Sequence, residues 1–297
     1  MGADPVVVIG NFDGVHRGHV ELLRTARAAE PDAPLVVVTF WPHPMSVVRP
    51  DQAPQLLSSL PRRVEMLRGA RADDVVVVDF TAEVAGWSPT QFVDAVLRPL
   101  HPCRVVVGEN FRFGFRASGT VETLARLGAG SFAVQPVPLV TDGAQASSST
   151  LVRHAVAEGD FGRVRELSDQ PFRFCGVVVQ GDQRGRLLGY PTANVAVAPG
   201  MAVPADGVYA GWVTRLDVGE APRWPAAISV GSNPTFDGVQ RRIESYVLDR
   251  DDLELYGVEI AVDFYARIRG QVRFAGVEPL IAQMHHDVEE IRQLLAG

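Results

Sequence analysis

The sequence contains no lysine, because all 28 residues counted as Lys or Arg are arginine. This absence excludes Schiff-base catalysis by a protein amine and a Walker-type phosphate loop, both of which need a lysine. Positive charge is also in deficit, since 35 acidic residues give a net charge of -7 at pH 7. Neither half of the chain has the basic excess of a nucleic-acid-binding protein, so we expect no nucleic-acid partner.

Cysteine is also scarce. Cys103 and Cys175 are the two cysteines, one in each half of the chain, which argues against a disulfide framework and a cysteine-based zinc site. The N-terminus has no targeting character, and no apolar run is long enough to cross a bilayer. We expect a soluble, cytoplasmic protein with no membrane partner and no obligate protein partner.

The first half, residues 1–168, alternates short apolar runs with stretches of helical periodicity. The apolar runs are "PVVVIG", "PLVVVTF", "DDVVVVDF" and "RVVVGENF". Continuous apolar strands without polar alternation indicate a parallel sheet covered by helices on both faces. The pattern predicts a doubly wound α/β domain of the Rossmann type.

The second half, residues 169–297, changes to strands joined by turns rich in Gly, Pro and Asn. The segment "VEIAVDFYARIRG" alternates apolar and polar residues with a period of two, which is typical of a half-buried antiparallel strand. Several such strands predict a small antiparallel β-barrel. An apolar stripe from Val277 to Ile291 then predicts a closing C-terminal helix.

The stretch "GNFDGVHRGH" at residues 10–19 lies between the first predicted strand and the first predicted helix. Ligands of open α/β sheets bind at this edge, and the N-terminus of the following helix favours phosphate. Gly14 and Gly18 allow the backbone to approach a phosphate chain, and His16 and His19 can donate hydrogen bonds to it.

Other interpretations of this stretch are a dinucleotide or Walker-type phosphate site, a zinc site and a chance turn. It contains neither the G-x-G-x-x-G fingerprint of dinucleotide sites nor the G-K-[ST] of Walker loops. A zinc site usually needs two histidines four residues apart and a third ligand, and the sequence offers no clear third ligand. The remaining alternative is a turn that holds two histidines by chance.

The stretch resembles the G-x-F-D-G-x-H-x-G-H signature of the HxGH adenylyltransferases. More narrowly, the chain resembles the bacterial bifunctional FAD synthetases, which combine riboflavin kinase and FMN adenylyltransferase. Three further segments carry this resemblance: "VVTFWPHP" at 37–44, "VVVGENFRFG" at 105–114 and "SSSTLVR" at 147–153. The chain departs from the family pattern at Trp41, where an acidic residue is usual, and at Ser147, where isoleucine is usual.

The resemblance implies site residues in the first half. His16 and His19 would hold the nucleotide phosphates during catalysis, and Phe40 would bind the flavin. The implied ATP-binding residues are Gly10, Phe12, Asp13, Gly14, His16, Gly18, His19, Asn110, Ser148, Ser149, Thr150 and Arg153.

The second half contains "GDQRGRLLGYPTANVAV" at 181–197. Thr192 and Asn194 offer hard oxygen ligands suitable for Mg²⁺, although "PTAN" alone fits an ordinary loop equally well. The longer string resembles the riboflavin kinase motif in which this Thr and Asn hold magnesium and ATP phosphates. That resemblance implies ATP binding by Gly181, Gly189 and Pro191, and flavin binding by Arg186.

Two residues near the C-terminus complete the implied kinase site. Glu244 resembles the catalytic base of the family, and its alternation with Tyr246 and Leu248 predicts that the three share an interior face of the barrel. A positioned carboxylate of this kind contributes roughly 10²–10⁴-fold to proton removal. Arg269 resembles an arginine near the flavin. A solvent-exposed strand position is the alternative for both residues.

The family resemblance therefore implies two activities, both dependent on Mg²⁺. Riboflavin and ATP would give FMN and ADP in the second half, and FMN and ATP would give FAD and pyrophosphate in the first. Two alternatives remain open: a paralogue limited to the kinase step or to a modified flavin, and a flavin-binding protein without catalysis.

Overall fold

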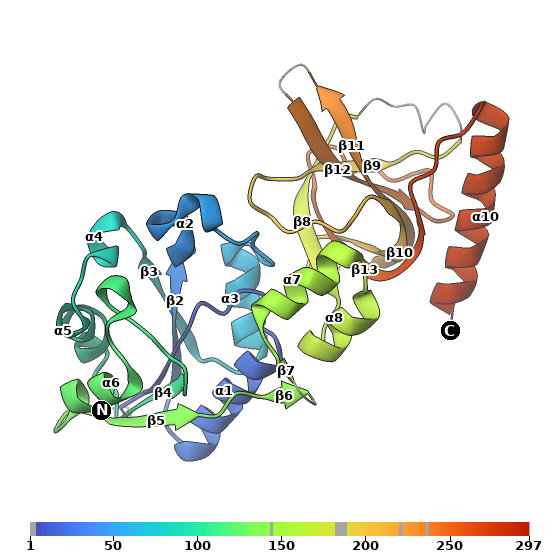
Figure 1. Cartoon of the computed structure of the whole chain (residues 1–297). Coiled ribbons are helices and arrows are strands. Elements are labelled where there is room, and N and C mark those ends of the chain that lie inside the picture. The colour runs from blue at the N-terminus through green and yellow to red at the C-terminus, as the bar shows by residue number, and fades with distance from the viewer. Residues whose placement is uncertain (1–3, 143–144, 182–188, 220–221, 236–237, 297) are drawn as a thin grey trace. The chain divides into compact units, whose positions relative to one another are not determined.

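The computed structural model describes residues 4–142, 145–181, 189–219, 222–235 and 238–296 (Figure 1). The chain divides into two compact units, residues 1–149 and 150–297. Residues 150–168 therefore group with the second unit, and the boundary expected at residue 168 stays a prediction.

The first unit is built on a five-stranded parallel sheet in the order β3-β2-β1-β4-β5. Its strands are β1 (Val6–Ile9), β2 (Leu35–Trp41), β3 (Asp74–Asp79), β4 (Arg104–Gly108) and β5 (Ala133–Val137). Strands β2 and β3 extend the sheet on one side of β1, and β4 and β5 extend it on the other. In such sheets this change of direction between β1 and β4 opens a crevice at the carboxyl ends of the strands. A short hairpin, β6 (Thr141–Asp142) and β7 (Gln145–Ala146), follows the sheet.

Helices cover both faces of this sheet, as the continuous apolar strands predict. Helices α1 (Arg17–Ala29) and α3 (Leu60–Gly69) contribute to the core on one face. Helices α5 (Pro89–Phe92) and α6 (Val121–Gly128) contribute to the core on the other. The shorter elements are α2 (Pro44–Val48), α4 (Ala82–Ala85), a π turn η2 (Val93–Leu97), and the 3-10 turns η1 (Pro50–Gln52), η3 (Arg98–Leu100) and η4 (Phe115–Ala117).

The second unit is a closed antiparallel barrel in the order β10-β11-β12-β9-β8-β13. Its strands are β8 (Phe172–Val179), β9 (Ala193–Ala196), β10 (Gly207–Arg215), β11 (Arg223–Thr235), β12 (Gly238–Val247) and β13 (Glu259–Gly270). Helices α7 (Ser149–Glu158) and α8 (Phe161–Ser168) precede the barrel, and α10 (Val277–Ala296) closes the chain.

Helix α10 packs along the outside of the barrel (Figure 1). Ile291 is fully buried there against Val208, Ala210 and Leu248. The structure thus confirms the predicted fold class: a Rossmann-like α/β domain, a small antiparallel barrel and a C-terminal helix. Within the residues that the structure describes, no helix is long and apolar enough to cross a membrane.

Candidate active sites

The loop between β1 and α1 brings the two histidines of the first motif together. His16 is the N-cap of α1, and its Nδ1 accepts a hydrogen bond from the backbone N–H of Gly18 at 3.2 Å. The rings of His16 and His19 stack with centroids 3.7 Å apart. The first turn of α1 carries no acidic residue, so its positive dipole end remains available to a phosphate.

Phe12 and Gly14, which precede His16 in the motif, support this loop from inside the protein. Phe12 is fully buried and packs its ring edge-on against His19, with centroids 5.0 Å apart. Gly14 has a φ of +78°, and a Cβ at this position would lie 2.7 Å from a methyl carbon of Leu57. Only glycine meets both conditions without strain, so these two motif residues support the loop from within the protein.

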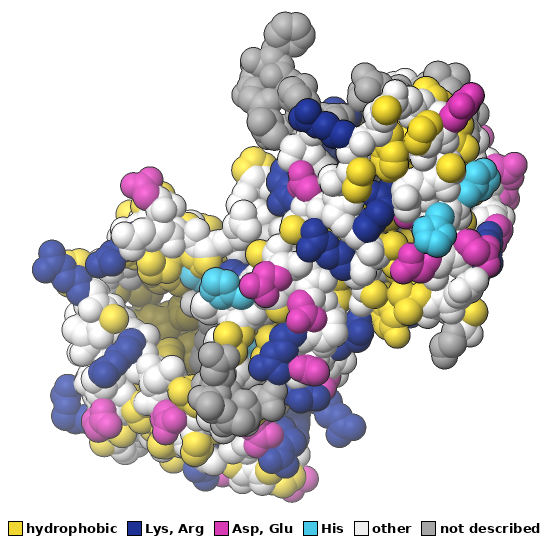
Figure 2. All heavy atoms as spheres, turned by 45° about the vertical axis from the view of Figure 1, so that its right-hand side comes forward, with side chains coloured by type: hydrophobic (Ala, Val, Ile, Leu, Met, Phe, Trp, Pro, Cys, Tyr) yellow, Lys and Arg dark blue, Asp and Glu magenta, His cyan; other side chains and the backbone are white. Residues whose placement is uncertain are grey.

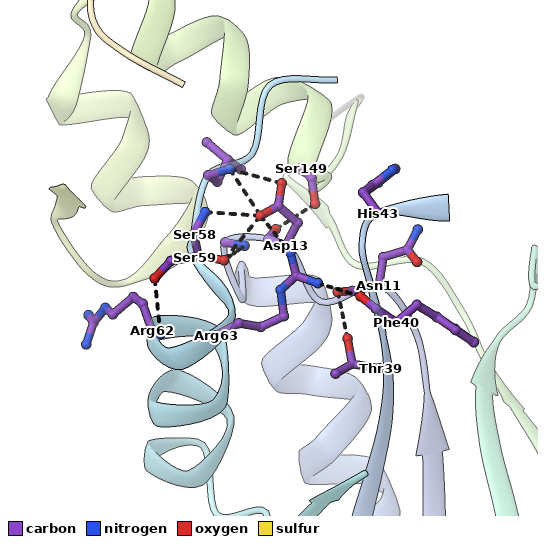
Figure 3. Close-up of polar contacts among 12 residues, drawn as sticks. Asn11, Asp13, Thr39, Phe40, His43, Ser58, Ser59, Arg62, Arg63 and Ser149 are labelled. Carbon is purple, nitrogen blue, oxygen red and sulfur yellow. Dashed lines mark hydrogen bonds and ion pairs between the residues drawn. The ribbon is translucent and has the colours of Figure 1, made fainter. Parts of the chain in front are cut away.

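Asp13 also points into the protein (Figure 3). Its carboxylate is 1% exposed and accepts hydrogen bonds at 3.1 Å from the backbone N–H groups of Leu57 and Ser58 and from the Ser58 hydroxyl. Arg63 completes the set, with its Nη2 3.3 Å from Asp13 Oδ1. In this structure Asp13 therefore anchors the loop, a role that the sequence motif did not indicate.

The serine segment predicted to bind ATP reaches the same loop. Ser149 Oγ donates a hydrogen bond to the backbone carbonyl of Asp13 at 2.8 Å, and Ser148 precedes it in the chain. Ser147, singled out in the sequence only as a departure from the family, lies with its Oγ 3.4 Å from His16 Nδ1. Thr150 and Arg153 lie on α7, among the residues that group with the second unit.

A cavity of about 1090 Å³ opens beside this loop, at the carboxyl ends of β1 and β2. Figure 2 shows a hollow lined by hydrophobic side chains on this face of the first unit. The aromatic residues of its lining are Phe40, Phe80, Phe92, Phe111, Phe113 and Phe115. Among the described residues that line it there is no carboxylate, whereas Arg49, Arg112 and Arg116 supply positive charge.

Sequence reasoning found Phe40 and Gly10 among the lining residues and missed most of the wall. The alternating phenylalanines of "FRFGF" at 111–115 were the available signal, since three aromatics at every second position indicate one common face. Asn110 lies just before them and is exposed in the loop that follows β4. Its Oδ1 lies within 3.2 Å of the position that a Cβ on Gly108 would occupy.

In the second unit, the barrel aligns the predicted metal ligand with the predicted base. Asn194 on β9 pairs in register with Glu244 on β12, which in turn pairs with Ser229 on β11. Paired residues of antiparallel strands point to the same face of a sheet. Asn194 and Glu244 are therefore cross-strand neighbours.

The side chain of Asn194 fits a cation ligand. Asn194 is 6% exposed, and its Nδ2 donates to the carbonyl and the hydroxyl of Thr192 at 3.2 and 3.3 Å. Its Oδ1 is buried and has no hydrogen-bond partner among the described residues. A buried acceptor of this kind is costly unless it is used, and an amide oxygen beside a threonine hydroxyl is a donor set that suits Mg²⁺.

A glycine of the kinase motif lies directly against Asn194. A Cβ on Gly181 would lie 2.6 Å from the side chain of Asn194, so only glycine allows this approach. Gly189 and Pro191 flank Tyr190, whose ring packs edge-on against Tyr246 with centroids 5.0 Å apart. Arg186 lies outside the described residues.

The expectation that Glu244 shares an interior face of the barrel is wrong. Ile243 and Ser245 are fully buried inside, whereas Glu244 and Tyr246 are half-buried. Tyr246 packs in the cluster that includes Ile291 of α10, so Glu244 lies on the face that this helix partly covers. Closure of the sheet into a barrel decides which set of alternating residues points inward, and alternation alone does not reveal it.

Arg269 lies on the same face and is held by α10. Its guanidinium forms three hydrogen bonds with the carboxylate of Asp287, at 2.6, 3.0 and 3.0 Å. Asp287 is 4% exposed and also accepts a hydrogen bond from Gln283 at 2.8 Å. The structure therefore fixes Arg269 to α10 through a contact that the sequence did not indicate.

A zinc site of the kind considered for the two histidines finds no support. Within the part of the chain that the structure describes, no group of three or more His, Cys, Asp or Glu side chains could hold a metal ion. Both cysteines are free thiols.

Two catalytic domains of known families account for nearly the whole chain. Residues 2–151 match the FAD synthetase family model, and residues 168–295 match the riboflavin kinase model. The fold and the two sites therefore define a two-domain protein with a nucleotidyltransferase domain and a riboflavin kinase domain.

Individual relatives match over the full length. A bifunctional riboflavin kinase/FMN adenylyltransferase of Listeria monocytogenes is 36% identical over 98% of this chain and 92% of its own length. The protein of that name from Escherichia coli strain K12 is 35% identical over 95% and 90%. A solved structure titled as a macrolide-efflux protein from Streptococcus pneumoniae superimposes with a TM-score of 0.87, 32% identity and coverage of 98% and 95%. The chain belongs to the bifunctional riboflavin kinase/FMN adenylyltransferase family and carries both of its domains.

Proposed function

We propose that the protein makes FAD from riboflavin in two steps. The second unit transfers the terminal phosphoryl group of ATP to riboflavin and releases ADP. The first unit then joins the resulting FMN to the adenylyl group of a second ATP and releases pyrophosphate. The observation that carries this proposal is that the chain contains both family domains, FAD synthetase over residues 2–151 and riboflavin kinase over residues 168–295.

In the kinase step, Glu244 would accept the proton of the ribityl hydroxyl as its oxygen attacks phosphorus. The register of β9 and β12 supports this role, because it places the carboxylate next to the residues that would hold the metal. Thr192 and Asn194 would hold Mg²⁺. The buried Oδ1 of Asn194, which lacks a hydrogen-bond partner among the described residues, supports that assignment. When bound, the ion would neutralise charge on the phosphates.

In the adenylylation step, a phosphate oxygen of FMN would attack the α-phosphorus of ATP, and pyrophosphate would leave. This chemistry needs alignment and charge stabilisation rather than a covalent intermediate. His16 and His19 would donate hydrogen bonds to the phosphates at the N-terminus of α1. The aromatic cavity that includes Phe40 would hold the flavin ring, and its arginines suit a phosphorylated flavin.

The cytoplasm is the proposed compartment, and the free thiols of Cys103 and Cys175 support it. The small-molecule partners proposed are riboflavin, FMN and ATP.

One assay tests the proposal against both alternatives. The purified protein is incubated with riboflavin, ATP and Mg²⁺, and the flavins are separated by chromatography. We expect FAD. Accumulation of FMN alone would instead identify a kinase-only paralogue, and unchanged riboflavin would identify a flavin-binding protein without catalysis.

A further inference from the structure

We infer that Arg63 is a positioning residue for adenylyl transfer. Its buried guanidinium connects the phosphate loop, which is the segment between β1 and α1, to the wall of the flavin cavity. The inference rests on the proposed function of the first unit. Arg63 lies on α3, more than forty positions along the chain from the motif loop, and its side chain is fully buried (Figure 3).

The guanidinium group of Arg63 contacts both halves of the site. Its Nη2 lies 3.3 Å from Asp13 Oδ1, and its Nη1 donates a hydrogen bond to the backbone carbonyl of Phe40 at 3.2 Å. The ring of Trp41 adds a third contact, with its centroid 5.4 Å from the guanidinium carbon. The planar guanidinium can contact several partners in different directions at once, whereas a lysine ammonium is a point charge without that geometry.

The contacts with Asp13 and Phe40 lead directly to groups with a proposed role. Asp13 lies three residues before His16 and fixes the backbone of the loop that carries both histidines. Phe40 lines the cavity proposed for the flavin, at the carboxyl end of β2. Arg63 therefore sets the position of the phosphate-binding loop relative to the flavin-binding wall, although it touches neither substrate.

The expected consequence follows from the geometry of the reaction. The attacking oxygen comes from the flavin side of the site, and the attacked phosphorus is held on the loop. A misplacement of about 1 Å between reacting groups can reduce a rate by about 10²-fold. Because each substrate keeps its own contacts, loss of Arg63 should lower kcat far more than it weakens the binding of either substrate.

The test compares Arg63→Met with Arg68→Met, which makes the same substitution at an exposed position of the same helix. Steady-state FAD formation from FMN and ATP gives kcat and both KM values. We expect kcat to fall about 10²-fold in Arg63→Met, with each KM changed by less than about threefold. Riboflavin phosphorylation by the second unit of the same protein should be unchanged, and Arg68→Met should match the parent in both reactions.

Two further variants separate positioning from folding. Removal of one partner leaves a buried charge unpaired, whereas replacement of both partners is often tolerated. The double variant Asp13→Asn with Arg63→Met should therefore fold even where Arg63→Met does not, and it should retain the low kcat. Arg63→Lys restores the charge without the planar guanidinium, so it should recover thermal stability more completely than it recovers kcat.

Specific results would overturn the inference. A folded double variant that makes FAD at the parental kcat would do so, and so would a loss confined to KM or full recovery of kcat by Arg63→Lys. The parent protein is assayed alongside the variants. If the parent makes no FAD, the proposed function itself fails, and that result is distinguishable from an effect of Arg63.

Discussion

Asn194 and Glu244 face the same side of the barrel as direct cross-strand neighbours on β9 and β12. This register brings the buried amide oxygen of Asn194, which has no hydrogen-bond partner among the residues that the structure describes, next to a half-buried carboxylate. In the proposed kinase step, the backbone pairing of the two strands would set the separation between the metal ligand Asn194 and the proton acceptor Glu244.

The first prediction concerns Glu244, the proposed base of the kinase step. Glu244→Gln retains the size and hydrogen bonding of Glu244 but cannot accept the ribityl proton. Riboflavin phosphorylation should fall by roughly 10²–10⁴-fold, as measured by chromatography of FMN and FAD after incubation with riboflavin and ATP. The same protein supplied with FMN should make FAD at nearly the parental rate, because that reaction uses the first unit. Loss of both activities in a folded protein would contradict two independent sites.

Sequence patterns sufficed for the architecture because period-two alternation, apolar parallel strands and the closing helix are local signals. They did not suffice for contacts between distant segments. Asp13 lies within a recognisable motif, yet its partners Leu57, Ser58 and Arg63 are more than forty residues away. The same holds for Arg269, whose partner Asp287 depends on how α10 packs. The prediction that Glu244 lies on the interior face is wrong, because closure of the barrel decides which face is interior and the alternation of residues does not.

The second prediction concerns the charge of the flavin cavity. Val48 lines this cavity and is 55% exposed, so a polar substitution there should leave the fold intact. Val48→Glu places a carboxylate in a wall that otherwise carries arginines, and it should repel the phosphate of FMN by about 1 kcal/mol, or roughly fivefold in KM. The measurement is KM for FMN in FAD synthesis. Val48→Gln is the matched neutral control, and an equal KM in both variants would show that charge is not the cause.

The third prediction links Asp73 to acid stability. The backbone N–H of Leu35 and the guanidinium of Arg27 donate hydrogen bonds to its carboxylate at 2.7 and 2.6 Å, and these bonds lower the pKa of Asp73 below 3.8. A lowered folded-state pKa means that the contribution is fully present above the unfolded pKa and is lost as the pH falls through the folded pKa. Since the Asp73 side chain is 54% exposed, we expect at most about 1 kcal/mol.

Thermal unfolding followed by circular dichroism tests this expectation. The melting temperature of Asp73→Asn should lie below that of the parent at pH 7, and the difference should shrink as the pH falls below about 4. Asp74→Asn is the control, since Asp74 is exposed at the adjacent position and accepts a local hydrogen bond from the backbone N–H of Val75. A difference that grows toward low pH would contradict the proposed sign.

The fourth prediction removes the two stacked imidazoles from the phosphate loop. His16 caps α1 and stacks on His19, so both imidazoles lie at the positive end of this helix. In the variant His16→Ala with His19→Ala, the N-terminus of α1 remains, but the side-chain donors that would stabilise charge on the transferring phosphates are lost. Loss of a single such donor typically costs about 10²–10³-fold in rate, so loss of both should bring FAD formation below detection.

The kinase reaction supplies the internal control for this variant. With riboflavin, ATP and Mg²⁺, the double variant should still produce FMN at the parental rate, and FMN should accumulate instead of passing on to FAD. Glu244→Gln shows the complementary pattern, so the two variants mixed in one reaction should together restore FAD synthesis from riboflavin. That outcome requires free FMN to leave one protein and enter the other. A mixture that makes no FAD, although Glu244→Gln still converts added FMN, would mean that the FMN made by the histidine variant stays bound to that protein.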